Sequence, residues 1–352
     1  MGGGNRISAL VFFYLQLKIL AMKVLVTGGG GFLGSHLARR LFGRGDDVTV
    51  LGRNAYPQFD EPIHCIQVDI RDRDALTRAL KGQEVVFHMV AIPSIWGDYN
   101  DFYQTDVVGT DNVIAACRAQ NVKKLIYTSS PSVIFGQEDL EGADESVPYP
   151  KTYLCHYPKT KAMAEQHVMQ ANGNTLATVC LRPHLIWGPG DPHLVPRLIK
   201  RARRNKLLRV GDGTNRVDMI YIDNAVEAHV QACERLESDR GGIAGNCYFV
   251  SDGNPVVLWN WINDVLKKLG LPQAKRSVSF KTATILGAFL EGVYGLLRVK
   301  KEPPMTRFLA AQLATSHYFN ISRARRDFGY NPVVSSEEGM GRLVEYFIRQ
   351  ED

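Results

Sequence analysis

The stretch VLVTGGGGFLGSHLARR, Val24–Arg40, joins a β-branched run to a glycine-rich turn and a helical pattern. Gly28, Gly31 and Gly34 are spaced G-x-x-G-x-x-G between the expected strand and the expected helix. Glycine at these points allows a tight turn, close approach of the backbone to a pyrophosphate and close packing of the helix on the strand. The helix N-terminus then offers free N–H groups to the phosphates. A glycine-rich turn without a ligand is the alternative, but the flanking strand and helix favour a dinucleotide-binding site.

The same rhythm of short apolar runs and helical segments continues on the C-terminal side of this stretch. The expected strands are KVLVTG (23–28), DVTVLG (47–52), IHCIQVDI (63–70), EVVFHMV (84–90), KKLIYTSS (123–130) and LATVCLRP (176–183). Strands that alternate with helices at this spacing are typical of an α/β fold with a parallel, doubly wound sheet, the NAD(P)-binding Rossmann fold.

The rhythm breaks after Pro183, where proline, aromatic residues and apolar helical segments become more frequent. We expect an NAD(P)-binding domain over residues 22–183 with return segments near 217–250. A smaller, discontinuous substrate-binding region is expected over 184–216 and 251–352. Residues 1–21 are an apolar extension interrupted by Gln16 and Lys18, too short for the ~20 residues that span a bilayer. Met22 is the expected functional start, and a weak interfacial anchor is the alternative.

Charge and cysteine usage exclude several classes of protein. The net charge of +6 is concentrated in RLIKRARRNKLLR, Arg197–Arg209, which fits a solvated helix face or a surface for anionic substrates or lipid headgroups. No aromatic residues interleave this run and no nucleic-acid module is present, so no nucleic-acid binding is expected. The six cysteines are scattered singly, which predicts free thiols in a reducing compartment and no metal site. A cytoplasmic protein is expected, with membrane association as an alternative.

The second expected strand indicates which dinucleotide is bound. NAD requires an acidic residue at the end of this strand for the ribose hydroxyls, but the strand ends in Gly52 and Arg53, and no carboxylate follows until Asp60. Gly52 leaves room for a 2′-phosphate that Arg53 can pair with. NADP(H) is therefore favoured over NAD(H), although Arg53 can also be read as an ordinary surface residue.

Two residues of the segment VDIRD (68–72) are expected at the adenine. The carboxylate of Asp69 is placed to accept a hydrogen bond from the adenine amine, and Ile70 to pack on the ring. Helix capping by Asp72 is the structural alternative for this acidic cluster.

Tyr157 and Lys161, in the segment YPKTK, are the expected catalytic pair. They lie four residues apart and share one face of an expected helix. A nearby ammonium, together with oxidised nicotinamide, lowers the pKa of a phenol, so such a tyrosine can give a proton to a carbonyl oxygen or take one from an alcohol. A hydroxyl that holds the substrate oxygen is expected from YTSSPS (127–132), with Ser130 preferred and Ser129 in reserve.

Together these motifs identify a family. The chain resembles extended short-chain dehydrogenases/reductases over nearly its whole length from Lys23, in the ordered segments TGGGGFLG, VDIRD, VVGTDNVIAAC, YTSS, YPKTK, LRPHLIWGPGD and FGYNP. Within them it is similar to the 3β-hydroxysteroid dehydrogenase/isomerase branch, through YTSSPSV, LVPRLI, VGDGTNRVDMIYIDNA and EPPMTRF, and there to bacterial 2-alkyl-3-oxoalkanoate reductases.

The resemblance implies specific residues. It implies Ser130, Tyr157 and Lys161 as the catalytic set, with Lys161 also holding the nicotinamide ribose. Around the cofactor it implies Gly28, Gly31, Phe32, Leu33, Gly34, Arg53, Asp69, Ile70 and Pro183, together with Tyr157 and Lys161. Two departures from the family pattern affect the cofactor contacts: Asp106 stands where asparagine is usual, and Met89 and Val90 stand where small residues are commoner.

The resemblance also implies the activity. The expected reaction is NADPH-dependent reduction of a β-keto acid with two long alkyl chains, in long-chain hydrocarbon synthesis. The alternatives are oxidation of a 3β-hydroxyl group on a steroid or a sterol-4-carboxylate, a sugar-nucleotide epimerase or dehydratase, and a non-enzymatic redox sensor. Homodimerisation through the helices at 111–119 and around Tyr157 is the habit of the family.

The substrate side of the cleft is expected to be apolar. Candidate contacts are Ile95 and Trp96 after the fourth strand, and His184 and Trp187 after the sixth, with His184 as a contact for a carboxylate or carbonyl. The apolar segment 282–299 is interpreted as a core helix, with a lid over a lipid-like chain or an interfacial contact as the alternatives.

Overall fold

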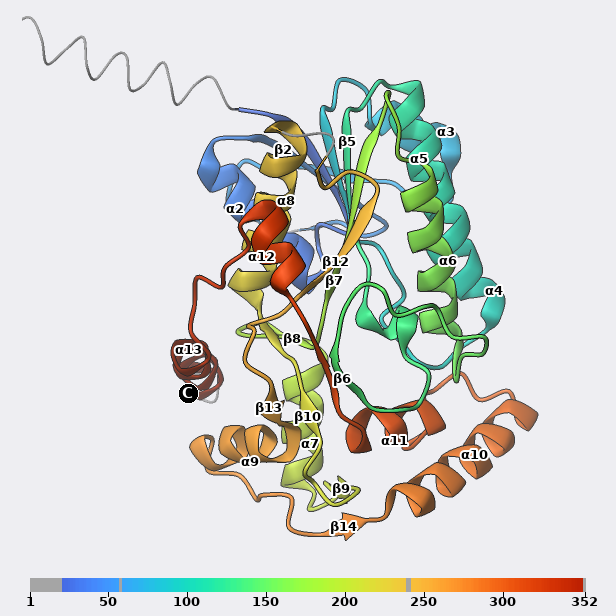
Figure 1. Ribbon diagram of the computed structural model, residues 1–352, viewed down its shortest axis with the longest axis vertical. Helices are drawn as coiled ribbons and strands as arrows, with labels where there is room; N and C mark the ends of the chain where they lie inside the picture. Colours follow the sequence, from blue (N-terminus) through green and yellow to red (C-terminus); the bar gives the residue numbers. More distant parts are fainter. Residues whose placement is uncertain (1–20, 57–58, 239–241, 351–352) are drawn as a thin grey trace, which may run out of the picture.

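The computed structural model describes residues 21–56, 59–238 and 242–350, so the expectation for residues 1–20 lies outside it. A sheet of seven parallel strands forms its centre, in the order β12-β7-β5-β4-β1-β2-β3 (Figure 1). The strands are β1 (Lys23–Thr27), β2 (Asp47–Gly52), β3 (His64–Gln67), β4 (Val85–His88), β5 (Lys124–Thr128), β7 (Ala177–Pro183) and β12 (Asn246–Val250). This is the predicted doubly wound α/β fold.

Helices cover both faces of this sheet (Figure 1). On one face lie α2 (Phe32–Arg44), α8 (Ile222–Ser238) and α12 (Ser322–Phe328), and on the other α3 (Arg73–Ala79), α5 (Gly109–Ala119) and α6 (His156–Gln170). Side chains of a strand alternate between the two faces, so Val24 and Val26 join the core on one side and Leu25 joins the core on the other. This double burial explains why the strands read as nearly continuous apolar runs.

The remaining elements lie mainly beyond the carboxyl ends of the strands (Figure 1). The helical ones are α4 (Tyr99–Phe102), the π-helical η2 (Tyr103–Val108), the 3₁₀ turn η3 (Pro131–Ile134), α7 (Leu194–Arg203), α9 (Leu258–Lys268), α10 (Phe280–Leu296), α11 (Arg307–Ala314) and α13 (Ser336–Arg349). Short strands form three small sheets: β6 (Leu140–Ala143) with β10 (Arg216–Val217), β13 (Val256–Val257) and β15 (His317–Phe319); β8 (Ile186–Trp187) with β11 (Ile220–Tyr221); and β9 (Arg209–Val210) with β14 (Ser277–Val278).

The strand order reverses direction next to β1. The chain moves outward through β2 and β3 and then returns to place β4 on the other side of β1. Ligands of doubly wound sheets bind in the crevice at the carboxyl ends of the strands at such a switch point. Thr27 and His88, the last residues of β1 and β4, are paired in register and mark this crevice.

Candidate active site

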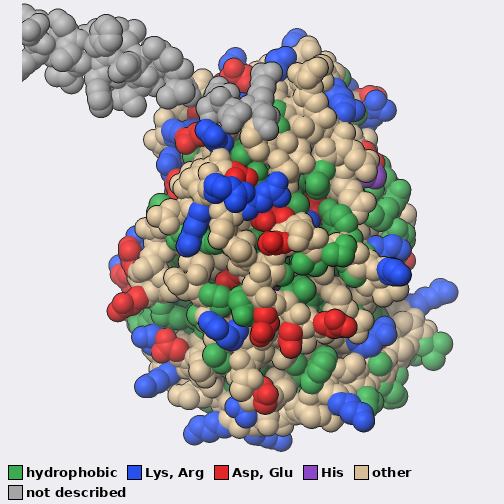
Figure 2. All heavy atoms as spheres, viewed as in Figure 1, with side chains coloured by type: hydrophobic (Ala, Val, Ile, Leu, Met, Phe, Trp, Pro, Cys, Tyr) green, Lys and Arg blue, Asp and Glu red, His purple; other side chains and the backbone are tan. Residues whose placement is uncertain are grey.

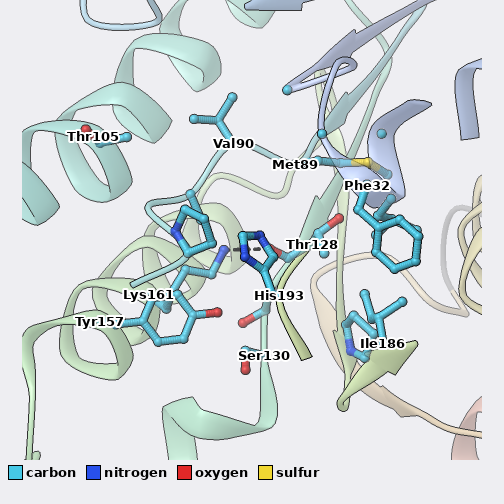
Figure 3. A pocket seen from close by; sticks show the side chains of 18 of the residues that line it. Phe32, Met89, Val90, Thr105, Thr128, Ser130, Tyr157, Lys161, Ile186 and His193 are labelled. Atoms are coloured by element: carbon cyan, nitrogen blue, oxygen red, sulfur yellow. Dashed lines mark hydrogen bonds between the residues drawn. The ribbon is translucent and has the colours of Figure 1, made fainter. Parts of the chain in front are cut away.

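A cavity of about 730 Å³ opens at the switch point, within the size range of small-molecule and cofactor sites. It brings together residues that are far apart in the sequence, among them Phe32, Ser130 and His193 (Figure 3), and it extends to α11. The predicted site residues in its wall are Gly28, Gly31, Phe32, Leu33, Gly34, Arg53, Asp69, Ile70, Ser130, Tyr157, Lys161, Pro183 and His184.

The glycine-rich turn has the geometry that a pyrophosphate site needs. Gly28 has a φ of +70°, in the left-handed region, and its N–H donates to the carbonyl of Leu51 over 2.7 Å. A Cβ atom on Gly34 would lie 2.3 Å from the Gly28 carbonyl oxygen, so only glycine lets α2 pack this closely on the turn. Gly31 is the N-cap of α2, whose first N–H groups therefore face the cavity. These residues fit a dinucleotide.

The ring of Tyr56 fills the space over Gly52, which differs from the sequence prediction. The space over Gly52 was expected to be open, but a Cβ atom there would lie 1.4 Å from the phenol oxygen of Tyr56, and one on Gly30 would lie 1.9 Å from its ring. The phenol oxygen also accepts a hydrogen bond from the Gly30 backbone, and burial raises the pKa of Tyr56. Glycine at 30 and 52 therefore makes room for this ring in the structure described here. Tyr56 also lines the cavity, next to Arg53.

The acidic cluster after β3 has divided roles. Asp69 lies in the cavity wall, and its carboxylate accepts hydrogen bonds from the guanidinium of Arg71, the shortest of them 2.6 Å. These hydrogen bonds hold the pKa of Asp69 below its usual value. Asp72 is a helix cap, since its side chain accepts from the N–H of Ala75 over 2.9 Å at the start of α3. Ile70 is buried between the cavity and α5.

Ser130, Tyr157 and Lys161 face the same part of the cavity (Figure 3). Ser130 lies close enough to the Tyr157 phenol to lower its pKa. The Lys161 ammonium donates to the carbonyl of Thr128 over 2.6 Å and lies 4.2 Å from the centre of the Tyr127 ring. Ser130 begins the turn η3, where its Oγ accepts from the N–H of Ser132 over 3.2 Å, so its direction is fixed. The arrangement can hold a carbonyl oxygen and supply it with a proton.

The charges of this group depend on burial. Burial raises the pKa of Tyr157 to about 12, against the opposing effect of Ser130, and it lowers the pKa of Lys161 to about 8. The phenol therefore keeps its proton at neutral pH, as a proton donor must. Asp106 and Glu165 counteract the effect of burial on Lys161 and favour its charged form.

Asp106 occupies a position where the family pattern has asparagine, and it fastens the catalytic helix. One carboxylate oxygen accepts from the hydroxyl of Thr160 over 2.7 Å, and the other from the N–H of Ile92 over 3.3 Å. Thr160 lies on α6 between Tyr157 and Lys161. The π-helical turn η2, a conformation frequent at functional sites, carries Asp106.

A buried ion pair lies behind Lys161. Glu165, one helical turn further along α6, accepts from Arg182 over 2.6 and 2.9 Å and from the hydroxyl of Tyr149 over 2.6 Å. Both charged side chains are almost completely buried. Charge-assisted hydrogen bonds of this kind fix the orientation of α6 relative to β7. Ser129, the reserve candidate, is buried, lines the same cavity and lowers the pKa of Glu165, whereas Ser130 acts on the pKa of Tyr157.

Three of the expected substrate contacts lie outside the cavity wall, which corrects the interpretation of them. Trp187 is 1% exposed and packs edge-on against Tyr221 and Trp261 in the core. The indole N–H of Trp96 donates to the carbonyl of Val299 over 2.9 Å, and Ile95 packs with a small apolar cluster against α11. The sequence showed that these side chains are apolar and close to strand ends, but long-range packing decided which way they face.

His184 lies in the cavity wall but is not a cation. Its Nε2 lies 2.6 Å from Nδ1 of His317, and burial lowers its pKa well below the usual value. A neutral imidazole already paired in this way is a poor contact for a carboxylate. The next residue, Leu185, has a φ of +44°, and non-glycine residues in this region concentrate at functional sites.

His193 is a cavity residue that the sequence interpretation missed. Its imidazole projects into the same cavity as Tyr157 and Lys161 (Figure 3). Asp191 accepts from the N–H groups of His193, Leu194 and Val195 and so fixes the start of α7. The sequence feature that could have indicated His193 is Asp191 in the segment DPHLV (191–195), an acidic residue that can cap a helix. Phe308, the last residue of the segment EPPMTRF, and Gln312, which no local motif marks, also line the cavity from α11, as do Met89 and Val90.

Within residues 21–56, 59–238 and 242–350, no three His, Cys, Asp or Glu side chains are grouped so that they could hold a metal ion. Over the same ranges, no helix has the length and apolar character needed to cross a membrane.

Sequence comparison places the chain among known proteins. Residues 25–281 match the model of the 3-beta hydroxysteroid dehydrogenase/isomerase family. A 2-alkyl-3-oxoalkanoate reductase of Stenotrophomonas maltophilia is 49% identical over 92% of this chain and 98% of its own length. That of Shewanella oneidensis is 44% identical, over 93% and 87%. The mouse sterol-4-alpha-carboxylate 3-dehydrogenase, decarboxylating, is 33% identical, over 93% and 91%.

Structural comparison gives the same fold. Gox2253 is 25% identical with a TM-score of 0.76, over 93% of this chain and 98% of that chain. MoeE5 in complex with UDP-glucose and NAD is 23% identical with a TM-score of 0.71, over 94% and 100%. The cavity has the parts of a nicotinamide site: glycine-rich turn, helix N-terminus, and tyrosine and lysine at the switch point. With this site and these relatives, the chain belongs to the 3-beta hydroxysteroid dehydrogenase/isomerase family.

Proposed function

We propose that this protein reduces the 3-oxo group of a 2-alkyl-3-oxoalkanoic acid to a hydroxyl group, with NADPH as reductant. The observation that carries the proposal is the convergence of Ser130, Tyr157 and Lys161 on one wall of the cavity. The choice of substrate is supported by the two reductases that are 49% and 44% identical to the chain over nearly their whole lengths.

When bound, a reduced nicotinamide cofactor would supply a hydride to C3 of the substrate. Ser130 holds the carbonyl oxygen, and Tyr157 gives that oxygen its proton, so the ketone gains one hydride and one proton and becomes the alcohol. The Lys161 ammonium stabilises the phenolate left behind until a proton from solvent replaces the lost one. Asp106 holds Thr160, and hence the turn of α6 between the two catalytic side chains, in place.

The substrate carboxylate needs a partner that can carry positive charge. His184 is neutral and paired with His317, and Lys161 is engaged by Thr128, so neither is suited to this role. We assign it to His193, which projects into the cavity from the start of α7. His193→Gln should raise KM for the acid by about tenfold and leave KM for an ester of the same chain length nearly unchanged.

Arg53 and Tyr56 supply the preference for NADPH in this proposal. Arg53 follows Gly52 in the cavity wall, where a 2′-phosphate would extend from the adenosine ribose, and a guanidinium suits that group. The Tyr56 phenol beside it donates a hydrogen bond to the same phosphate in this proposal. Arg53→Ala should therefore weaken NADPH binding by about ten- to a hundredfold and change NADH binding little. Equal weakening for both cofactors would overturn the assignment.

The test is absorbance at the reduced-nicotinamide band with a synthetic 2-alkyl-3-oxoalkanoic acid, NADPH or NADH, and a Tyr157→Phe control. Oxidation of NADPH that requires the acid and Tyr157 is the expected result. Oxidation of a 4-carboxysterol by NAD or NADP, with no turnover of the oxo acid, would move the substrate to the sterol class. A sugar-nucleotide dehydratase is not expected, because Pro131 and Ser132 follow Ser130 where that enzyme would need acidic residues, and the apolar segment AIPSIWG suits a sugar diphosphate poorly.

A further inference from the structure

Charged side chains are spread over the face of the protein seen in Figure 2, where water stabilises them. Lys161 is in a different situation, because it is only 2% exposed. Burial disfavours the charged form of an amine and lowers the pKa of Lys161 to about 8. Whether this amine is charged at neutral pH and above therefore depends on the groups that the protein places around it.

Two consecutive residues of β5 hold the ammonium of Lys161. Its Nζ donates to the carbonyl of Thr128 over 2.6 Å (Figure 3) and lies 4.2 Å from the centre of the Tyr127 ring. An ammonium within ~6 Å of a ring centre is attracted by the negative face of the π system, most strongly where water is excluded. Tyr127 is completely buried, so its ring can exert this attraction at nearly full strength.

The hydroxyl group of Tyr127 does not account for its contact with the amine. Within the part of the chain that the structure describes, this oxygen is buried and has no hydrogen-bond partner. A buried hydroxyl without a partner costs free energy, so the ring carries the benefit of this residue. Burial also raises the pKa of Tyr127 well above its usual value, so the phenol stays neutral beside the ammonium.

The other titratable side chains around Lys161 come from η2, α6, β7 and β4. They are Asp106, Tyr157, Glu165, Cys180 and His88. The two carboxylates favour the charged amine. Burial keeps the imidazole and the thiol neutral, because it lowers the pKa of the imidazole to about 3 and raises that of the thiol well above its usual value. The ring of Tyr127, which lies directly against the amine, adds to the effect of the carboxylates.

We propose that Tyr127 is a positioning residue of the active site, whose ring keeps Lys161 charged and holds its ammonium at the end of β5. The inference rests on the function proposed above, in which this ammonium stabilises the phenolate of Tyr157. Only the charged amine can do this, so the ring extends activity to higher pH. Without the attraction of the ring, the pKa of Lys161 should fall by about one pH unit, and activity should be lost at a correspondingly lower pH.

Competitive labelling of the full chain measures the titration of Lys161 without any substrate. Lys161 lines the cavity, where a trace of acetic anhydride can react with its neutral form, and mass spectrometry over a series of pH values gives its pKa. Tyr127→Phe keeps the ring and should leave this pKa nearly unchanged. Phenylalanines of increasing fluorine content at position 127 weaken the negative face of the ring at nearly constant shape. The pKa should then fall stepwise, by about one pH unit over the series.

The matched control is Leu125→Ala, two residues earlier in β5 and equally buried. It removes packing but no contact of the amine, so it should lower the melting temperature and leave the pKa of Lys161 unchanged. The upper limit of kcat against pH should move with the labelling result. A pKa that stays constant through the fluorinated series would overturn the inference. A stepwise fall in a protein that does not turn over the oxo acid would support the inference and contradict the proposed function instead.

Discussion

The two sides of the cavity are built in different ways. The cofactor side comes from consecutive strand ends and a glycine-rich turn, whose residues are local in sequence and fixed by backbone geometry. The other side comes from α7 and α11, which are brought together by packing between segments more than a hundred residues apart. Changes on the first side should therefore affect binding and chemistry directly, whereas changes on the second should act through packing and substrate fit.

The largest effect is expected at Tyr157, where the two sides meet. Tyr157→Phe removes the proton donor but keeps the ring, so kcat should fall by about 10³-fold, within the range for loss of a general acid. Cofactor affinity, measured by fluorescence titration, should change less than about threefold. A variant that retains more than a tenth of wild-type kcat would assign the proton transfer to another group.

The next largest effect is expected at Trp187, which is buried in the core and does not line the cavity. Trp187→Ala should lower the free energy of unfolding by about 3–5 kcal/mol, because it leaves a large cavity between Tyr221 and Trp261. Since the side chain does not line the active-site cavity, KM measured well below the melting temperature should stay near the wild-type value. Chemical denaturation and steady-state kinetics on the same sample check both. A large rise in KM without loss of stability would return Trp187 to the substrate site.

A glycine pair tests the cofactor side. Gly34→Ala places a methyl group 2.3 Å from the Gly28 carbonyl oxygen, so the turn must shift and cofactor affinity should fall by at least about tenfold. Gly43→Ala, on the same helix with no heavy atom within 4 Å of the new Cβ, should instead stabilise the protein by about 0.5–1 kcal/mol. Calorimetric titration and thermal melts compare the two variants. Equal effects would contradict the close-packing argument.

The last prediction concerns Asp218, a buried carboxylate that lies outside the cavity wall. Asp218 accepts from the N–H of Phe319 over 2.7 Å, and burial raises its pKa to about 6. A raised pKa means that the folded state holds the proton more tightly, so this contribution to stability is present at pH 4 and is lost as the pH rises to about 6. Relative to Asp218→Asn, the wild type should therefore lose on the order of 2 kcal/mol over that interval. Denaturation curves at several pH values between 4 and 6 measure this difference. Free energies of unfolding that change equally with pH in the wild type and in Asp218→Asn would contradict the prediction.

The sequence predicted for a physical reason that the residues of the glycine-rich turn and of the Tyr157 helix would lie together at one edge of the sheet. Glycine spacing, helix periodicity and strand ends are local properties, and Gly28, Gly34, Tyr157 and Lys161 lie where those properties place them. Tyr56 was missed although it lies only a few residues after Gly52, because nothing local indicates that its ring folds back over Gly30 and Gly52.

The other side was predicted less well, because an apolar residue near a strand end can face either the core or the cavity. Trp187 and Trp96 turned toward other parts of the protein, and His193 was passed over for His184. Which residues of α11 reach the cavity depends on how the chain returns across more than a hundred residues. No periodic pattern in the sequence predicts a contact between segments so far apart in the chain.

Isotope transfer tests the central claim most directly. The protein would be incubated with a 2-alkyl-3-oxoalkanoic acid and NADPH that carries deuterium in the transferable position of the nicotinamide, and the product would be analysed by mass spectrometry. A 3-hydroxy acid with one deuterium on C3 and an equal amount of NADP is the predicted result, and Tyr157→Phe should abolish it. Cofactor recovered unchanged, or an alcohol without deuterium on C3, would contradict the assignment of this protein as a reductase.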